Sequence, residues 1–87
     1  MTETKKSIFT KKYNQFRELI ITARKEADLS QVDLAKKIKR PQSFVSKYER
    51  GERRLDIVEF LEVSKAIGIN PLKIIKELER GCEDHKN

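Results

Sequence analysis

The apolar residues along this chain recur at intervals of three and four, which is the spacing of one face of an α-helix. No stretch alternates between apolar and polar residues as a half-buried strand does. Three glycines and two prolines fall between the periodic stretches, where they mark helix ends. The pattern predicts an all-α fold of five helices, at about 10–27, 31–38, 41–50, 57–67 and 71–81, with polar segments 1–9 and 82–87 outside a domain of residues 10–81.

Capping residues stand where these helices are predicted to begin. The hydroxyl of Ser30 can accept a hydrogen bond from the amide of Asp33, and Asp56 with Glu59 has the spacing of a capping box. Pro41 suits the first position of a helix and forces the residue before it into an extended conformation. The second and third helices are therefore expected to be joined by a tight turn.

A helix pair of this kind needs a small side chain where the two helices cross, and Ala35 provides it. At about 100° per residue, the third helix turns Val45, Tyr48 and Glu49 inward. The opposite edge is polar and is not needed by the core; it consists of Gln42, Ser43, Ser46, Lys47 and Arg50. Gln can pair with adenine and Lys with guanine, so this edge suits the reading of a major groove. The alternative interpretation is an ordinary solvated helix face.

The distribution of charge favours the first interpretation. The formal net charge is +6, and charged residues make up 39% of the chain. Residues 36–54 hold eight bases and only the acids Glu49 and Glu52, whereas five bases face seven acids from Leu55 onward. A basic cluster beside two turn-linked helices is typical of a protein that binds a polyanion such as DNA.

Other function classes find little support in the sequence. No apolar run approaches the ~20 residues that span a bilayer, and no signal peptide is visible, so we expect a cytoplasmic protein with no membrane contact. Cys82 and His85 are each the only residue of their type, which gives no disulfide and no metal site. No nucleophile–base arrangement or glycine-rich phosphate cradle is present. We therefore expect no enzymatic activity, no cofactor and no small-molecule ligand.

The order and spacing of several short motifs resemble the helix-turn-helix regulators of the phage Cro and lambda-repressor type, also called the xenobiotic-response-element type. The similar region runs from about Phe16 to Leu78. The motifs are Leu29-Ser30-Gln31, Leu34-Ala35, Ser43 with Val45-Ser46, Glu49-Arg50-Gly51 and Ala66-Ile67-Gly68-Ile69. The resemblance implies a compact five-helix domain that binds double-stranded DNA, with the second and third helices as the helix-turn-helix.

The resemblance also implies roles for individual residues. Gln42, Ser43 and Lys47 would meet base edges, and Arg24 with Glu49 would form a structural ion pair. The phosphate contacts that the resemblance implies would come from Gln31, Arg50, Arg53 and Arg54. Ser46 is added to this set because it lies on the polar edge of the third helix.

Two residues depart from the family pattern. Lys39 occupies a turn position that is commonly glycine, and a left-handed lysine there would cost about 1 kcal/mol. Phe44 replaces a small polar residue. It can touch a thymine methyl group, but its spacing from Tyr48 favours packing at the edge of the core.

A single recognition helix reads few base pairs, so we expect a homodimer on half-sites ~34 Å apart. The fifth helix is the candidate interface, through Ile69, Leu72 and Ile75, unless the monomer's own core buries them. The main hypothesis is a transcriptional regulator that acts as a repressor. The alternative is an antitoxin or accessory subunit that binds a partner protein through the fifth helix and regulates its own operon.

Overall fold

Five helices make up the fold, as predicted. The structure is a computed structural model that describes residues 10–84, with side chains described to Arg80. The helices are α1 (Lys11–Glu26), α2 (Gln31–Ile38), α3 (Gln42–Arg50), α4 (Ile57–Ile67) and α5 (Pro71–Asp84). Residues 10–84 contain no strand, which confirms the all-α class. The predicted polar segment 1–9 lies outside the described residues.

The predicted capping residues begin their helices. The Ser30 hydroxyl accepts from the amide of Asp33 at 3.0 Å, and the Asp33 carboxylate accepts from the amide of Ser30 at 3.0 Å. The same reciprocal pair forms between Asp56 and Glu59 at the start of α4. These bonds satisfy amides that have no partner within the helix. Pro41 differs from the prediction: it is the extended N-cap of α3 and not its first helical residue.

Left-handed residues end α2, α3 and α4. Gly51 and Gly68 have φ angles of 85° and 90°, a region that glycine occupies without steric cost. Lys39 ends α2 with φ 57° and ψ 46°, which confirms the expected left-handed lysine. The amide of Arg40 then donates to the carbonyl of Ala35 at 3.0 Å and closes the turn toward α3. The turn therefore keeps its shape without a glycine.

The end of the fifth helix was predicted wrongly. The sequence pattern places it at Gly81, but α5 continues to Asp84, so part of the predicted tail 82–87 is helical. A glycine inside a helix costs only about 1 kcal/mol relative to alanine, and no proline follows it to end the helix. Residues 85–87 lie outside the described part of the chain.

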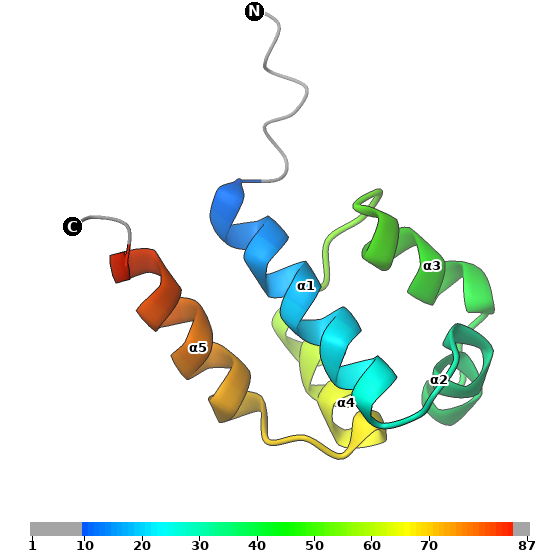
Figure 1. Cartoon of the computed structure of the whole chain (residues 1–87). Helices are drawn as coiled ribbons and strands as arrows, with labels where there is room; N and C mark the ends of the chain where they lie inside the picture. Colours follow the sequence, from blue (N-terminus) through cyan, green and yellow to red (C-terminus); the bar gives the residue numbers. More distant parts are fainter. Residues whose placement is uncertain (1–9, 85–87) are drawn as a thin grey trace, which may run out of the picture.

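The helices enclose one small core. α2 packs against α3 and α4, while α1 packs against α5 and α3. Figure 1 shows α2 and α3 together on one side of the molecule and α5 on the opposite side. The core consists of Ile20, Leu34, Ala35, Val45, Tyr48, Phe60, Val63, Ile67 and Ile74.

The apolar stripe of α4 is only partly buried. Phe60, Val63 and Ile67 belong to the core, as their spacing predicts. Ile57 and Leu61, which the helical repeat adds to the same stripe, remain 61% and 46% exposed. The repeat gives the direction of an apolar face, but the neighbouring helices decide how much of that face they cover.

Candidate nucleic-acid interface

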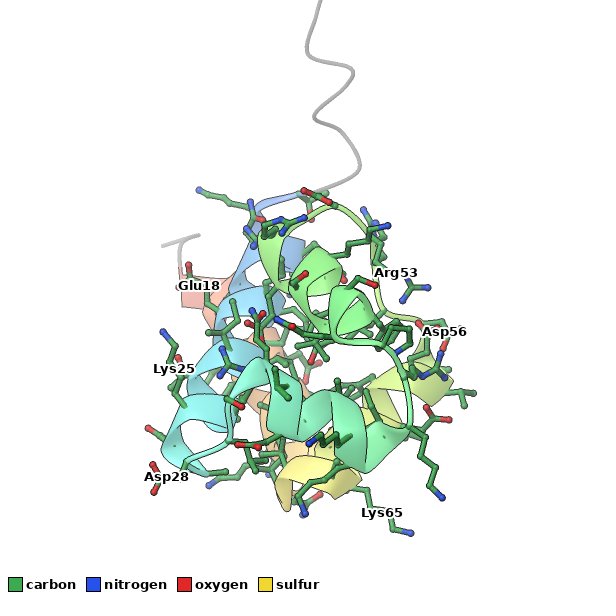
Figure 2. All side chains as sticks on the ribbon, turned by 90° about the vertical axis from the view of Figure 1, so that its right-hand side faces the viewer. Glu18, Lys25, Asp28, Arg53, Asp56 and Lys65 are labelled. Carbon is green, nitrogen blue, oxygen red and sulfur yellow. The ribbon has the colours of Figure 1, made fainter. Side chains whose placement is uncertain are left out.

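Helix α3 lies on the surface with its polar edge turned outward. Gln42, Ser43, Lys47 and Arg50 are exposed, and Ser46 is half-buried. Val45, Tyr48 and Glu49 are buried, as the helical spacing predicted. In Figure 2, α3 and α2 face the viewer, with Arg53 and Asp56 at one edge of this face and Lys25 and Asp28 at the other. The three predicted base-reading residues thus share one accessible surface.

A polar network fixes one edge of α3. The Arg24 guanidinium donates to both carboxylate oxygens of Glu49, at 2.8 and 2.9 Å. The side-chain amide nitrogen of Gln31 donates to the same carboxylate at 2.9 Å. The side-chain amide nitrogen of Gln42 then donates to the side-chain oxygen of Gln31 at 3.2 Å. An uninterrupted chain of hydrogen bonds therefore links the start of α3 to the interior.

The Arg24–Glu49 ion pair is buried. Arg24 is 8% exposed and Glu49 is 7% exposed, and a third hydrogen bond joins Arg24 to the carbonyl of Leu29 at 2.8 Å. The hydrogen bond to Glu49 raises the pKa of Arg24, against the effect of burial. A buried pair with its hydrogen bonds made constrains geometry more strongly than an exposed pair does. It fixes α1 to α3 and, through Leu29, to the start of α2.

Arg17 also holds α3, through a contact that no motif in the sequence indicates. Its guanidinium donates to the backbone carbonyl of Glu49, near the C-terminal end of α3. The same side chain is held by the Asn14 side-chain oxygen at 3.1 and 3.3 Å. A cation at a helix C-terminus is favourable because the last carbonyls are unsatisfied and partly negative. A lone arginine on an amphipathic helix carries no signal of this contact, because the partner is 32 residues away.

Phe44 lies at the edge of α3 that is remote from Gln42, about 200° around the helix. It is partly buried and meets Tyr48 edge-on, with ring centroids 5.6 Å apart and planes 73° apart. The guanidinium carbons of Arg40 and Arg53 lie over its ring, 4.6 and 4.8 Å from the centroid. The packing interpretation of Phe44 is confirmed, and the two arginine contacts were not predicted.

The cationic segment formed by the end of α3 and the loop after it lies beside this edge. Arg50, the last residue of α3, forms a bidentate ion pair with Glu52, with both distances at 2.9 Å. Arg53 forms a similar pair with Glu59 at 3.1 and 3.2 Å, and the guanidinium of Arg54 lies over the Tyr13 ring. Hydrogen bonds from these arginines lower the pKa values of Glu52 and Glu59. The loop thus presents cations whose orientation is already restricted.

The chemistry available elsewhere in the described structure is limited. Within residues 10–80, no cluster of three or more His, Cys, Asp or Glu side chains is arranged to hold a metal ion. None of the helices described here combines the length and apolarity that crossing a membrane requires.

Comparison with known proteins identifies the family. A model of the family described as helix-turn-helix matches residues 20–74, which include α2 and α3 and most of the core. This chain belongs to the XRE family of helix-turn-helix proteins. A solved structure described as an XRE-family like protein from Pseudomonas syringae pv. tomato str. DC3000 is 39% identical. The match covers 91% of this chain and 96% of that chain, with a TM-score of 0.80.

A second solved structure shares the fold of this XRE-family protein. It is a mutant of the restriction-modification controller protein C.Esp1396I, with 23% identity, a TM-score of 0.76 and coverage of 88% of this chain and 98% of that chain. None of the curated proteins is similar enough in sequence to count as a match. The family assignment makes the protein a DNA-binding transcriptional regulator of the five-helix helix-turn-helix fold.

Proposed function

We propose that the protein binds a specific double-stranded DNA site by inserting α3 into the major groove, and that it represses transcription by occupying an operator. The observation that carries this proposal is the exposed edge of α3, where Gln42, Ser43 and Lys47 lie together and serve no role in the core. Side chains of these types offer the hydrogen-bond donors and acceptors that distinguish base pairs in the major groove.

Phosphate contacts are proposed on both sides of this edge. Gln31 is at the first position of α2, where free amides and the helix dipole favour an anion. On the other side, Arg50 is the last residue of α3, Arg53 and Arg54 lie in the loop after it, and Ser46 completes the set from within the helix. The ion pairs of Arg50 and Arg53 with Glu52 and Glu59 involve exposed or half-exposed arginines, so phosphate can compete for them.

We also propose that the protein acts as a homodimer through α5. Leu72 and Ile75 are 64% and 42% exposed, and Ile57 of α4 lines the same shallow apolar hollow as Ile75. Ile69 is half-buried and lines a different hollow, between α1 and α5, while Ile74 is part of the monomer core. A second copy is the occupant that the proposed DNA binding requires, because one recognition helix spans too few base pairs for useful specificity.

Selection of binding sites from random duplexes, followed by fluorescence anisotropy titration, tests the DNA-binding proposal. We expect an enriched sequence with twofold symmetry, bound at least about 10³-fold more tightly than shuffled DNA. Failure to enrich any sequence, with no binding to shuffled DNA at low salt, would reject the proposal. A reporter gene placed behind the enriched sequence should be silenced by the protein, and activation would reject the role as repressor.

Sedimentation equilibrium tests the dimer, with Leu72→Glu as the disruptive variant and Lys73→Gln as its control, because Lys73 is on the same helix but lines the hollow between α1 and α5. We expect the wild type and the control to dimerise, and Leu72→Glu to remain monomeric, because a buried carboxylate without a partner opposes association. A wild type that is monomeric at high concentration, both free and on DNA, would reject the homodimer. If the same surface then retained an unrelated protein during purification, the alternative function as an accessory subunit would gain support.

A further inference from the structure

Two arginines that are distant in the sequence meet over one aromatic ring. Arg40 comes from the turn before α3 and Arg53 from the loop after it, and their guanidinium carbons lie 4.6 and 4.8 Å from the centre of the Phe44 ring. Arginine over an aromatic face is attracted by the negative potential of the ring. Phe44 is in turn held by the edge-on contact with the buried Tyr48. The ring therefore forms a fixed platform for two flexible cationic side chains.

Carboxylates of α4 also hold the same two arginines. Arg40 donates to Glu62 at 2.9 Å and lies 4.0 Å from Glu59, while Arg53 forms its bidentate ion pair with Glu59. A guanidinium has five N–H groups, so each arginine keeps donors that these bonds do not use. The side chains of Arg40 and Arg53 are 33% and 37% exposed. Both guanidinium groups are thus ordered and accessible to an anion.

The position of this platform on α3 indicates which anion it meets. Phe44 and Gln42 are about 200° apart around the helix, and the exposed ridge of Ser43 and Lys47 lies between them. Gln42 is hydrogen-bonded to Gln31 at the start of α2, so the platform is on the other flank of the ridge. A helix in the major groove has one sugar–phosphate backbone on each flank.

We propose that Phe44 is a positioning residue that orients Arg40 and Arg53 toward the DNA backbone opposite the one that Gln31 faces, and that Arg40 is a phosphate-contacting residue. This inference rests on the proposed function, in which the ridge enters the major groove. It gives Phe44 a role beyond packing and adds to the interface a residue that lies in the turn itself. It also fixes the tilt of α3, because phosphate contacts on both flanks prevent the helix from rolling in the groove.

The test compares Arg40→Gln with Arg80→Gln, a control that removes an exposed arginine of α5 paired with Glu77. Affinities for the selected duplex and for a shuffled duplex are measured over a range of KCl concentrations. We expect Arg40→Gln to lower the affinity for both duplexes by the same factor. It should also reduce the slope of log K against log salt by about 0.9, the value for one phosphate contact. Arg80→Gln should keep the wild-type slope. An unchanged slope for Arg40→Gln would overturn the proposal.

Phe44→Leu and Phe44→Tyr test the platform, since leucine keeps apolar volume without an aromatic face and tyrosine keeps the ring. We expect Phe44→Leu to lower the affinity for both duplexes about two- to fivefold for each arginine it releases. Phe44→Tyr should bind both duplexes as the wild type does. In the Phe44→Leu background, Arg40→Gln should cost less affinity than in the wild type. Additive effects, or wild-type binding by a folded Phe44→Leu, would overturn the positioning role.

The outcomes separate this inference from the function on which it rests. If Phe44→Leu does not melt cooperatively by circular dichroism, the salt slope of Arg40→Gln still decides the phosphate contact, and Phe44→Met, which also fills the site without an aromatic face, replaces Phe44→Leu in the double variant that decides the coupling. A wild-type protein that binds no duplex would overturn the proposed function. A wild type that binds, with an Arg40→Gln variant of unchanged slope, would overturn only the inference drawn here.

Discussion

Replacing Glu49 by alanine should destabilise the protein more than any other change to a charged residue in the helix-turn-helix. The Glu49 carboxylate accepts two hydrogen bonds from Arg24 and one from Gln31, and both charged residues are almost fully buried. Glu49→Ala therefore leaves the Arg24 cation in the interior with the Leu29 carbonyl as its one remaining hydrogen-bond partner among the described residues. Removal of one member of a buried pair typically costs about 3–5 kcal/mol.

This loss is large for a chain of this size. At about 0.05–0.15 kcal/mol per residue, the free energy of unfolding of 87 residues is about 4–13 kcal/mol, so the variant would lose about a quarter of it or more. Urea unfolding followed by far-ultraviolet circular dichroism measures the change. With a slope of about 1–1.5 kcal/mol per molar urea for a small domain, the midpoint should fall by about 2–5 M, or the variant should be unfolded without denaturant.

Glu52→Ala is the matched control, because Glu52 is also paired with an arginine but the pair is exposed. It should leave the urea midpoint almost unchanged. The double variant Arg24→Met with Glu49→Leu should recover most of the stability, since it removes both charges and fills their volume with apolar atoms. If Glu49→Ala unfolds at the same urea concentration as Glu52→Ala, the buried pair does not hold the helices as argued.

Three further predictions concern stability. Tyr48→Phe should unfold no more easily than the wild type, because the buried Tyr48 hydroxyl has no hydrogen-bond partner among the described residues. A free energy of unfolding, measured in urea, that is more than about 1 kcal/mol below the wild-type value would contradict this. Lys39→Gly should raise the free energy of unfolding by up to about 1 kcal/mol by relieving the left-handed backbone, and a loss in a thermal melt would argue against strain at that residue. Acid should destabilise the protein: hydrogen bonds lower the pKa values of Glu59 and Asp33 in the folded chain, so stability is constant near neutral pH and declines as the pH falls below about 4. Glu59→Gln should make that decline shallower, and an identical pH profile would show that Glu59 does not contribute.

Local signals in the sequence predicted most of the fold. The capping boxes at Ser30 and Asp56, and the glycines at Gly51 and Gly68, determine helix ends through contacts within a few residues, which a sequence displays directly. Gly81 misled the prediction because a glycine permits a helix end without requiring one. The apolar stripe of α4 was also only partly predictable. Its Ile57 remains exposed because no other helix of the described residues 10–84 covers it.

The candidate site was predictable in its residue types but not in its connections. Helical spacing alone put Gln42, Ser43 and Lys47 on one outward edge, and the structure agrees. The hydrogen bond between Gln31 and Gln42 depends on the angle at which α2 and α3 cross, which the sequence does not specify. The meeting of Arg40 and Arg53 over Phe44 depends on the paths of two separate loops. Such contacts need coordinates, because the partners are neither neighbours in sequence nor part of one periodic face.

The most direct test of the central claim is the affinity of Gln42→Ala for the selected duplex and for a shuffled duplex, measured by anisotropy at one salt concentration. Loss of a base contact should cost about 1–3 kcal/mol on the selected duplex, relax the preference at one base pair, and leave binding to shuffled DNA unchanged. Equal losses on both duplexes, or no loss on either, would contradict the claim that the outward edge of α3 reads the sequence of the DNA.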